Sequence, residues 1–524
     1  MRFSGNEIPS SLTTQNYRKD PMELYSALTI LAILIIGCVC ASKLSTWINI
    51  PVLVVFLGIG MLAGEQGIGQ IQFDDPNLAN IIGSIAMAFI LFSGGFDTKF
   101  SSVRKVFLCG TLLSTLGVLL TALFLGTMTY FFFLWMLPDK HLPLSWCLLL
   151  GSVISSTDAA AVFAILRSKR VSLRGKMQPL LEYESGSNDP MAAFLTIFLI
   201  PIAMADAKSG TQSGIVIYLP IFHSFLIRML LAVLFGWIWG KLAIWLCNKI
   251  DLEYDGLYYV IGISTVLLSF GGTEVLGGNG FMSVYVTGMV MGNGNFIYHN
   301  GLGRFYDGTA WLMQVVLFAM LGLLATPSDV WDASFVGLGI AGMLMFIARP
   351  LAVFLCMIKS PFTWNERLLA SWVGLRGGAP IMLATFPWAA GLIEHKLMFH
   401  IVFFIVLTSV ILQGMTIMPM ARWLGLDKPL QISPRVPLEF ENTGTLEGDT
   451  REFEVLPGAS FIGKTLAALG LPPGALVLLI RRDGKFLVPY GKTEILAYDA
   501  LMVLGSRETL AETGKVLGSS EETD

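Results

Sequence analysis

Three carboxyl groups stand in the stretch EYESGSNDP, residues 182–190, at the start of an apolar run that continues to about residue 205. A charged side chain in the middle of a membrane-spanning helix costs about 2.5–3.5 kcal/mol on insertion scales, so each one needs a reason. Ser185 and Asp189 are four residues apart and would share one face of a helix. Pro190 lacks an N–H group, which leaves the carbonyl of Gly186 free to turn towards an ion or water. The stretch therefore predicts an oxygen-rich, weakly solvated acid at Asp189.

Two further apolar stretches are interrupted by polar or helix-weakening residues. The run SSTD, residues 155–158, places four short polar side chains in succession, and such side chains compete for backbone hydrogen bonds and loosen a helix. The run GLRGGAP, residues 374–380, combines three glycines with Pro380, which frees the carbonyl of Arg376. Two broken helices in corresponding halves indicate a transporter built from inverted repeats, with its site where the breaks cross.

The composition of the chain is that of a membrane protein. Of its 524 residues, 54% are apolar and 14% are charged, and the mean hydropathy is +0.69, far above what a water-soluble domain of this length carries. This composition excludes a soluble enzyme for most of the chain, and the net charge of −3 gives no basic excess for nucleic acid. The six cysteines show neither a CxxC motif nor metal-ligand spacing, and we expect them to be buried hydrophobic side chains.

Apolar runs long enough to cross a bilayer fill residues 22–424. A hydrocarbon core about 30 Å thick needs roughly 20 apolar residues per helix, and fewer where a helix is broken inside protein. The offset between Asp158 and Arg376 is 218 residues, and the same offset carries Asp189 to position 407 in the last run, so both halves keep register. We expect about thirteen spans, at residues 22–45, 50–64, 78–96, 106–136, 144–166, 179–205, 215–247, 257–271, 279–293, 309–325, 333–358, 366–389 and 397–424.

The distribution of basic residues predicts how the chain lies in the membrane. The polar segment 1–21 lacks the basic-then-apolar order of a cleavable signal, so we expect it to remain as an N-terminal tail. Lys and Arg gather in one set of alternate loops, which includes Lys99, Arg167 and Lys249. Since such loops face the cytoplasm, we expect the N-terminus outside and the C-terminus inside a bacterial cytoplasmic (inner) membrane.

The C-terminal part of the chain is far more polar than the rest. Residues 427–524 hold 25 of the 71 charged residues, and residues 425–450, with three prolines and several acids, predict a linker. Alternating apolar patterns and short helical patterns follow over residues 451–524, which predicts a small cytosolic α+β domain. The expected elements are strands at 451–455, 476–481, 486–488 and 500–504, helices at 463–469 and 508–516, and a hairpin turn at RDGK, residues 482–485.

Four motifs in order carry a family resemblance. Thr157-Asp158 is followed by ESGSND at 184–189, then by Arg349-Pro350 and by GLRG at 374–377. Over residues 22–424 the chain thereby resembles the monovalent cation:proton antiporters of the NhaP type. The tail resembles the TrkA-C (RCK-C) regulatory domain, and three motifs carry this match: LPG at 456–458, PYG at 489–491 and DAL at 499–501.

The resemblance implies an ion site with two acids. Asp189 matches the acid that exchanges a monovalent cation for a proton, and Asp158 would lie opposite it in the unwound helix. Thr157 and Ser185 would add oxygen ligands or fix the carboxylates. The implied architecture is an all-α polytopic membrane protein of about thirteen helices with inverted repeats and two broken crossing helices, followed by the small α+β domain.

The resemblance also implies a set of supporting residues. Asn188 would hold the two crossing helices together, and its neutrality implies one cation for one proton. Glu184 would pair with Arg349 in a structural ion pair, and Arg376 would lie at the helix crossing. Relatives often balance that arginine with an acid in the third span; here Asp97 is the candidate substitute.

The chemistry of a buried carboxylate explains how such a site could exchange ions. K+ and Na+ are hard cations that favour oxygen ligands. A carboxylate kept from water binds either a proton or a cation more readily, and it holds one of them at a time. With protons entering down their gradient, the cation would be exported by alternating exposure of the site. We expect K+/H+ antiport, because TrkA-C domains resemble potassium-linked regulators; Na+/H+ antiport by the same mechanism is the alternative.

Other interpretations and partners complete the expectation. An intramembrane aspartyl protease would also use two acids, but it carries GxGD where this chain has GSND at 186–189. A ligand-gated cation channel is disfavoured by the single buried carboxylate and the absence of a filter sequence, and the acids could also be plain packing anchors. We expect a homodimer surrounded by lipid, without a cofactor, and a small-molecule or nucleotide effector of the tail to which no residues are assigned.

Overall fold

The computed structural model describes residues 21–48, 51–137, 142–209, 218–250, 252, 254–429, 449–455, 459, 461–482 and 485–517. Several predictions from the sequence lie outside these residues. They concern the N-terminal tail up to residue 20, most of the linker 425–450, the LPG motif at 456–458 and the central residues Asp483 and Gly484 of the expected hairpin turn.

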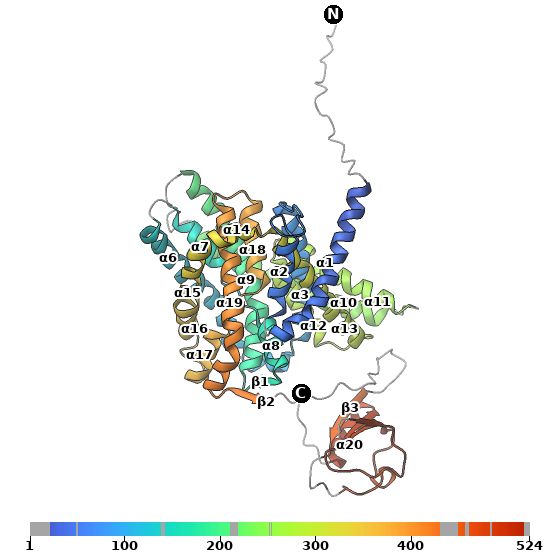
Figure 1. Cartoon of the computed structure of the whole chain (residues 1–524). Coiled ribbons are helices and arrows are strands. Elements are labelled where there is room, and N and C mark those ends of the chain that lie inside the picture. Colours follow the sequence, from blue (N-terminus) through green and yellow to red (C-terminus); the bar gives the residue numbers. More distant parts are fainter. Residues whose placement is uncertain are drawn as a thin grey trace, which may run out of the picture.

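The membrane part is mostly helical, and each of the thirteen apolar stretches contains helix (Figure 1). Eight helical stretches among the described residues are long and apolar enough to cross a membrane, so the predicted all-α membrane fold is confirmed while the count of thirteen crossings stays a prediction. The first helices are α1 (Pro21–Ile48), α2 (Val52–Ala63), α3 (Pro76–Asp97), α4 (Phe100–Arg104), α5 (Phe107–Leu112), the π-helical turn η1 (Leu113–Gly117), α6 (Val118–Met136), α7 (Leu144–Val153), α8 (Ala159–Ser168) and α9 (Met177–Ser209).

The second half repeats the alternation of long and broken helices. Its members are α10 (Tyr218–Lys249), α11 (Gly256–Val275), α12 (Gly280–Gly292), α13 (His299–Leu324), α14 (Pro327–Asp332), α15 (Ser334–Met343), the π-helical turn η3 (Leu344–Ala348), α16 (Arg349–Cys356), α17 (Trp364–Trp372), α18 (Gly378–Ala389) and α19 (His395–Trp423).

The helices form two bundles that meet along one face. In the first bundle α12 packs on α3 and α10, and α13 packs on α2 and α3. In the second bundle α7 packs on α6 and α9, while α19 packs on α15 and α18. Figure 1 shows α10 to α13 on one side of the body and α6, α7 and α15 to α19 on the other. Contacts of α18 with α3 and α13 join the two bundles.

Close packing inside the second bundle depends on two glycines that face each other. A Cβ atom on Gly151 of α7 would collide with the main chain of Ala122 and Gly126 of α6. A Cβ atom on Gly126 would collide with the main chain of Cys147 and Leu148. Small residues let helices in a membrane approach closely, where packing rather than the hydrophobic effect holds them together. α7 ends at the first helix break, so its contact with α6 holds the helix that precedes the break.

A short sheet links two loops of the second bundle. β1 (Val171–Leu173), between α8 and α9, pairs antiparallel with β2 (Asp427–Pro429), which follows α19. The Arg174 N–H donates to the Leu426 carbonyl at 2.9 Å and extends the pairing. Residues 427–429 belong to the predicted linker 425–450 and form a strand there. Strands of three residues carry no alternating pattern, because backbone pairing alone holds them.

The C-terminal domain has a four-stranded antiparallel sheet in the order β3-β6-β4-β5. Its core is formed by Phe453, Ile480, Leu501 and Val503, so the predicted α+β domain is confirmed. One element differs, because the helix expected at 463–469 is only a 3-10 turn that ends shortly before Gly470, which has a φ of 63°. The elements are β3 (Asp449–Glu454), η4 (Leu466–Ala468), β4 (Leu476–Arg482), β5 (Lys485–Leu487), β6 (Ala500–Gly505) and α20 (Arg507–Val516).

Gly151→Val should destabilise the protein by about 1–3 kcal/mol, because the new side chain would push α6 away from α7. The thermal unfolding midpoint of the purified protein in detergent measures this effect. Gly342→Val in α15 is the matched control, since no atom lies within 4 Å of the Cβ position there. Equal midpoints for the two variants would contradict the proposed packing contact.

Candidate functional site

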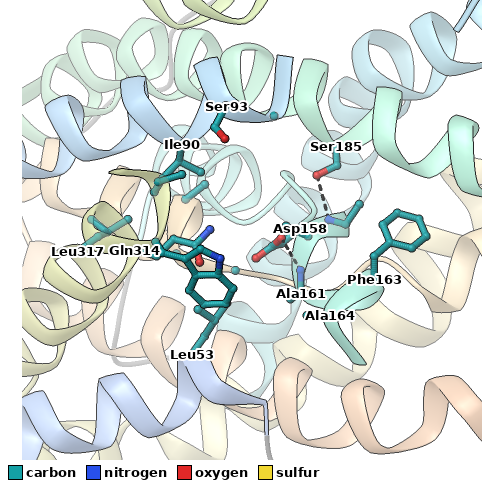
Figure 2. Close-up of a pocket in the computed structure, with 18 of the residues that line it drawn as sticks. Leu53, Ile90, Ser93, Asp158, Ala161, Phe163, Ala164, Ser185, Gln314 and Leu317 are labelled. Atoms are coloured by element: carbon teal, nitrogen blue, oxygen red, sulfur yellow. Dashed lines mark hydrogen bonds between the residues drawn. The ribbon is translucent and has the colours of Figure 1, made fainter. Parts of the chain in front are cut away.

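The first helix break is the unwound segment 154–158 between α7 and α8. Asp158 ends this segment and caps α8, since its Oδ1 accepts a hydrogen bond from the Ala161 N–H at 3.1 Å. A carboxylate is favoured at a helix N-terminus by the free N–H groups and by the helix dipole. Figure 2 shows the Asp158 carboxylate pointing into a pocket, with Ser185 beside the start of α8.

The second break, residues 373–377 between α17 and α18, crosses the first, as the sequence predicted. The Asp158 N–H donates to the Leu375 carbonyl at 2.8 Å, which joins the two unwound segments directly. The α-carbon of Gly377 lies against the Asp158 carboxylate, and a Cβ atom there would collide with that side chain. The glycine is therefore needed for the close approach of the second break to the acid.

Arg376 binds the free end of α7. Its Nη1 donates to the carbonyls of Ser155 and Ser156 at 2.7 and 2.5 Å, and its side chain is 1% exposed. These carbonyls belong to the segment where the helix ends, so the guanidinium satisfies them and offsets the negative end of the helix dipole. Asp97 was the candidate partner, and this expectation is wrong. No ion pair between Asp97 and Arg376 occurs among the described residues, because backbone carbonyls occupy the guanidinium instead.

Two residues of α19 that the sequence analysis did not single out hold the second break. The Arg376 N–H donates to Ser409 Oγ at 3.1 Å, and Gln413 Nε2 donates to the Trp372 carbonyl at 2.9 Å. Ser409 and Gln413 are themselves joined at 2.5 Å. The available signal was positional, since the internal offset of the two halves carries Asp189 to position 407, two residues before this serine.

α9 holds the first break in the corresponding way. Ser185 Oγ accepts from the Ala159 N–H and donates to the Thr157 carbonyl, both at 2.9 Å. Asn188 Nδ2 donates to Thr157 Oγ1 at 2.6 Å. The hydroxyls of Ser185 and Thr157 therefore already have protein partners. In each half, a broken helix is held by polar side chains of the long helix that follows it.

The ion pair of Glu184 and Arg349 lies deep in the second bundle. The two side chains are 1% and 2% exposed and approach to 2.5 Å, and Arg349 also donates to the Ala370 carbonyl at 3.4 Å. The pair thereby connects α9 with α16 and α17. Neither residue lines the pocket that contains the acids. The arrangement is that of a brace between helices.

The acids lie in a cavity of about 960 Å³ between the two bundles. Asp158, Asp189, Thr157 and Ser185 line it, so the four predicted ligands are brought together. Among the described residues, Asn188, Glu184, Arg349 and Arg376 stand outside the lining and hold the helices around it.

The opposite wall of the cavity comes from the first bundle and is mainly apolar. Leu53, Ile90 and Leu317 face the cavity there, together with Gln314 (Figure 2). The cavity reaches solvent at a rim of charged and exposed side chains, which are Asp97, Arg167, Lys169, Glu182 and Asp307.

The donor set at the centre of the cavity is made of oxygen atoms. The carboxyl-bearing residues Asp158 and Asp189 line the cavity together with the hydroxyl-bearing residues Ser156, Thr157 and Ser185. Such ligands suit hard cations, and the cavity gives an ion from solvent a path to both acids. The same carboxylates can accept a proton, so the site can hold either kind of cargo.

Two family models match the chain. The model described as sodium/hydrogen exchanger, transmembrane, matches residues 30–423, well over half of the chain. The model described as TrkA-C domain matches residues 450–518. The resemblances that the sequence motifs carried are thereby confirmed.

Similar proteins agree with this result. The K(+)/H(+) antiporter NhaP of Alkalimonas amylolytica is 37% identical over 498 residues, which cover 94% of this chain and 84% of that protein. The K(+)/H(+) antiporter NhaP2 of Shewanella sp. (strain ANA-3) is 36% identical over 502 residues, which cover 94% and 83%. In fold, the chain resembles the sodium proton antiporter MjNhaP1 of Methanocaldococcus jannaschii at pH 8, with a TM-score of 0.63 at 24% identity over 77% of this chain and 100% of that one. The chain therefore belongs to the sodium/hydrogen exchanger family of membrane transporters and ends in a TrkA-C domain.

Proposed function

We propose that this protein is a secondary active transporter that exchanges K+ for H+, one cation for one proton. It exports the cation from the cytoplasm at the expense of the proton gradient. The observation that carries the proposal is the position of Asp158 and Asp189, which line one solvent-reaching cavity where two broken helices cross. The names of the bacterial relatives favour potassium. Na+/H+ exchange by the same mechanism is the alternative, because carboxylate and hydroxyl oxygens also suit Na+.

The transport cycle that we propose needs one binding site that holds either a cation or a proton. A cation enters past the charged rim of the cavity and displaces the proton from Asp189, while Asp158 stays fixed as the cap of α8. Movement of the second bundle against the first then closes this path and opens one on the other side. A proton displaces the cation there, and the protonated site returns. We place the charged rim on the cytoplasmic side, because Arg167 and Lys169 belong to the predicted cytoplasmic loops.

Asp189→Asn should reduce exchange to the rate of protein-free vesicles, because an amide cannot carry the proton. The measurement is dye-reported proton movement in proteoliposomes after addition of K+, Na+ or Li+ separately. Asp332→Asn, at an exposed position of α14, is the matched control and should exchange like the parent. In the parent, the apparent KM for the cation should rise as the pH falls, since both cargoes compete for one seat. An Asp189→Asn variant that exchanges as fast as the parent would show that the seat lies elsewhere.

The brace of Glu184 and Arg349 supports the site structurally in this proposal. Glu184→Gln should lower stability by about 3–5 kcal/mol, because Arg349 then stays buried without its carboxylate partner. Glu184→Gln with Arg349→Met should recover part of the thermal unfolding midpoint lost in the single variant. If Glu184→Gln keeps the parent midpoint but loses exchange, the pair belongs to the transport path rather than to the scaffold.

The setting that we propose is the bacterial inner membrane, with a lipid-embedded homodimer and the C-terminal domain in the cytoplasm. In this proposal, β2 couples the C-terminal domain to the ion site. β2 leaves α19 towards the C-terminal domain and pairs with β1, which joins α8 to α9. Asp158 caps α8 and α9 carries Asp189, so a pull on β2 acts on both helices that position the acids. A small molecule that binds the C-terminal domain, a nucleotide being one class, would regulate exchange through this link.

Ser172→Pro removes an N–H from β1 and should uncouple the C-terminal domain from the site. Deleting residues 437–524 should shift the apparent KM for K+ in the parent and have little effect in the Ser172→Pro background, because the two changes act on one link. Ser172→Ala is the control, since it removes only the weak 3.4 Å hydrogen bond from its hydroxyl to the Lys428 carbonyl. Equal shifts in both backgrounds, measured in proteoliposomes, would mean that regulation takes another route.

A further inference from the structure

We propose that the hydroxyl of Ser156 is an additional ion ligand beside Asp189 and that it sets the preference of the site among monovalent cations. This inference rests on the proposed exchange function and names a specificity residue for it. The resemblance to known antiporters implied ligand roles for Thr157 and Ser185 and gave none to this serine.

The hydroxyl of Ser156 is buried and lies beside Asp189 without a regular hydrogen bond. The residue is 0% exposed and lines the cavity, and among the described residues its Oγ makes no hydrogen bond with full distance and angle geometry. Burying a hydroxyl without a hydrogen bond is unfavourable, so such groups usually have a partner. In our proposal, a cation bound at Asp189 supplies that partner. The hydroxyl lies beside the Asp189 carboxylate, which places it at the proposed seat.

The neighbouring hydroxyls are committed to the scaffold, which singles out Ser156. Ser155 Oγ donates to the Ser152 carbonyl at 2.6 Å, and Thr157 Oγ1 accepts from Asn188 at 2.6 Å. Ser185 Oγ both accepts and donates at 2.9 Å. Three of the four hydroxyls around the first break therefore hold backbone or side chains in place. The fourth, on Ser156, holds no backbone or side chain of the scaffold in this way among the described residues.

The main chain of Ser156 is fixed while its side chain is available. Its carbonyl accepts the guanidinium of Arg376 at 2.5 Å, which anchors the unwound backbone. A hydroxyl has two lone pairs and one donor hydrogen. With the seat empty, the O–H can point to the Asp189 carboxylate, and with a cation bound the same oxygen can turn a lone pair to the ion. The residue thereby serves the site in both states without backbone movement.

A neutral hydroxyl affects the choice of ion differently from a carboxylate. Selectivity among hard cations depends on the size of the site and on the number and field strength of its oxygen ligands. Small ions such as Li+ gain most from the strong field of carboxylates, whereas larger ions such as K+ need more ligands of weaker field. Removal of this hydroxyl should therefore weaken the binding of K+ more than the binding of Li+.

The test compares Ser156→Ala and Ser156→Cys with the parent in proteoliposomes, using K+, Rb+, Na+ and Li+ separately. The cysteine variant keeps the size of the side chain but replaces the hard oxygen with a soft sulfur. We expect the apparent KM for K+ and Rb+ to rise about 3- to 10-fold, as for loss of one hydrogen-bond-strength contact, with a smaller rise for Li+. Ser156→Thr, which keeps the hydroxyl, should restore the parent order of ions.

The control and the contrary outcomes separate this inference from the proposed function. Ser152→Ala in α7 removes a buried hydroxyl that donates to the Leu148 carbonyl at 2.9 Å, and it should leave the ion order unchanged. A parent that moves no protons with any of the four ions would overturn the proposed function itself. If the parent exchanges, unchanged KM ratios in both Ser156→Ala and Ser156→Cys would overturn only this inference. An equal KM rise for all four ions with a lower unfolding midpoint would also overturn it, since that result marks a structural role.

Discussion

Backbone that leaves a helix inside a membrane has no water to bind, and this constraint organises the centre of the molecule. Each unsatisfied N–H or carbonyl in hydrocarbon costs several kcal/mol, so a break survives only where protein groups satisfy it. Here each break satisfies the other. The Asp158 N–H binds the Leu375 carbonyl, and the Arg376 guanidinium binds the carbonyls of Ser155 and Ser156. Neither break would be tolerated alone, and the polar groups that satisfy them gather at the crossing.

The two halves solve the same problem with different side chains. α9 holds the first break through Ser185 and Asn188, and α19 holds the second through Ser409 and Gln413. The halves differ in charge at the crossing, since the first contributes carboxylates and the second contributes Arg376. The guanidinium of Arg376 binds helix-end carbonyls, and among the described residues it forms no salt bridge with Asp158 or Asp189. In the proposed exchange, both carboxylates therefore stay available to cations and protons.

Features that depend on residues close together in the sequence were predicted correctly. Features that depend on contacts between distant parts of the chain were missed. Apolar runs and clusters of small polar residues or glycines are local signals, and they located the helices, both breaks and the acids. Ser409 was missed because one hydroxyl in a long apolar helix does not reveal which way it points. The expectation for Asp97 failed because an arginine can be satisfied by carbonyls, which every residue carries. The pairing of β1 with β2 was missed for a related reason, since three-residue strands are fixed by backbone partners far away in the chain.

The distribution of the proposed ion ligands between the two bundles affects how the site can be exposed to one side of the membrane and then to the other. All the oxygen donors proposed for the ion belong to the second bundle, in the first break and in α9. The facing wall of the first bundle is mainly apolar, and Leu53, Ile90 and Leu317 line the cavity there. In the proposed cycle, an ion whose ligands all belong to the second bundle keeps those ligands when the bundles slide, because the facing side chains of the first bundle are mainly apolar. The scaffold hydrogen bonds travel with it, because they too lie within the second bundle. In the proposed cycle, movement along the apolar wall therefore changes which side of the membrane the ion site faces, while the geometry of its ligands stays constant.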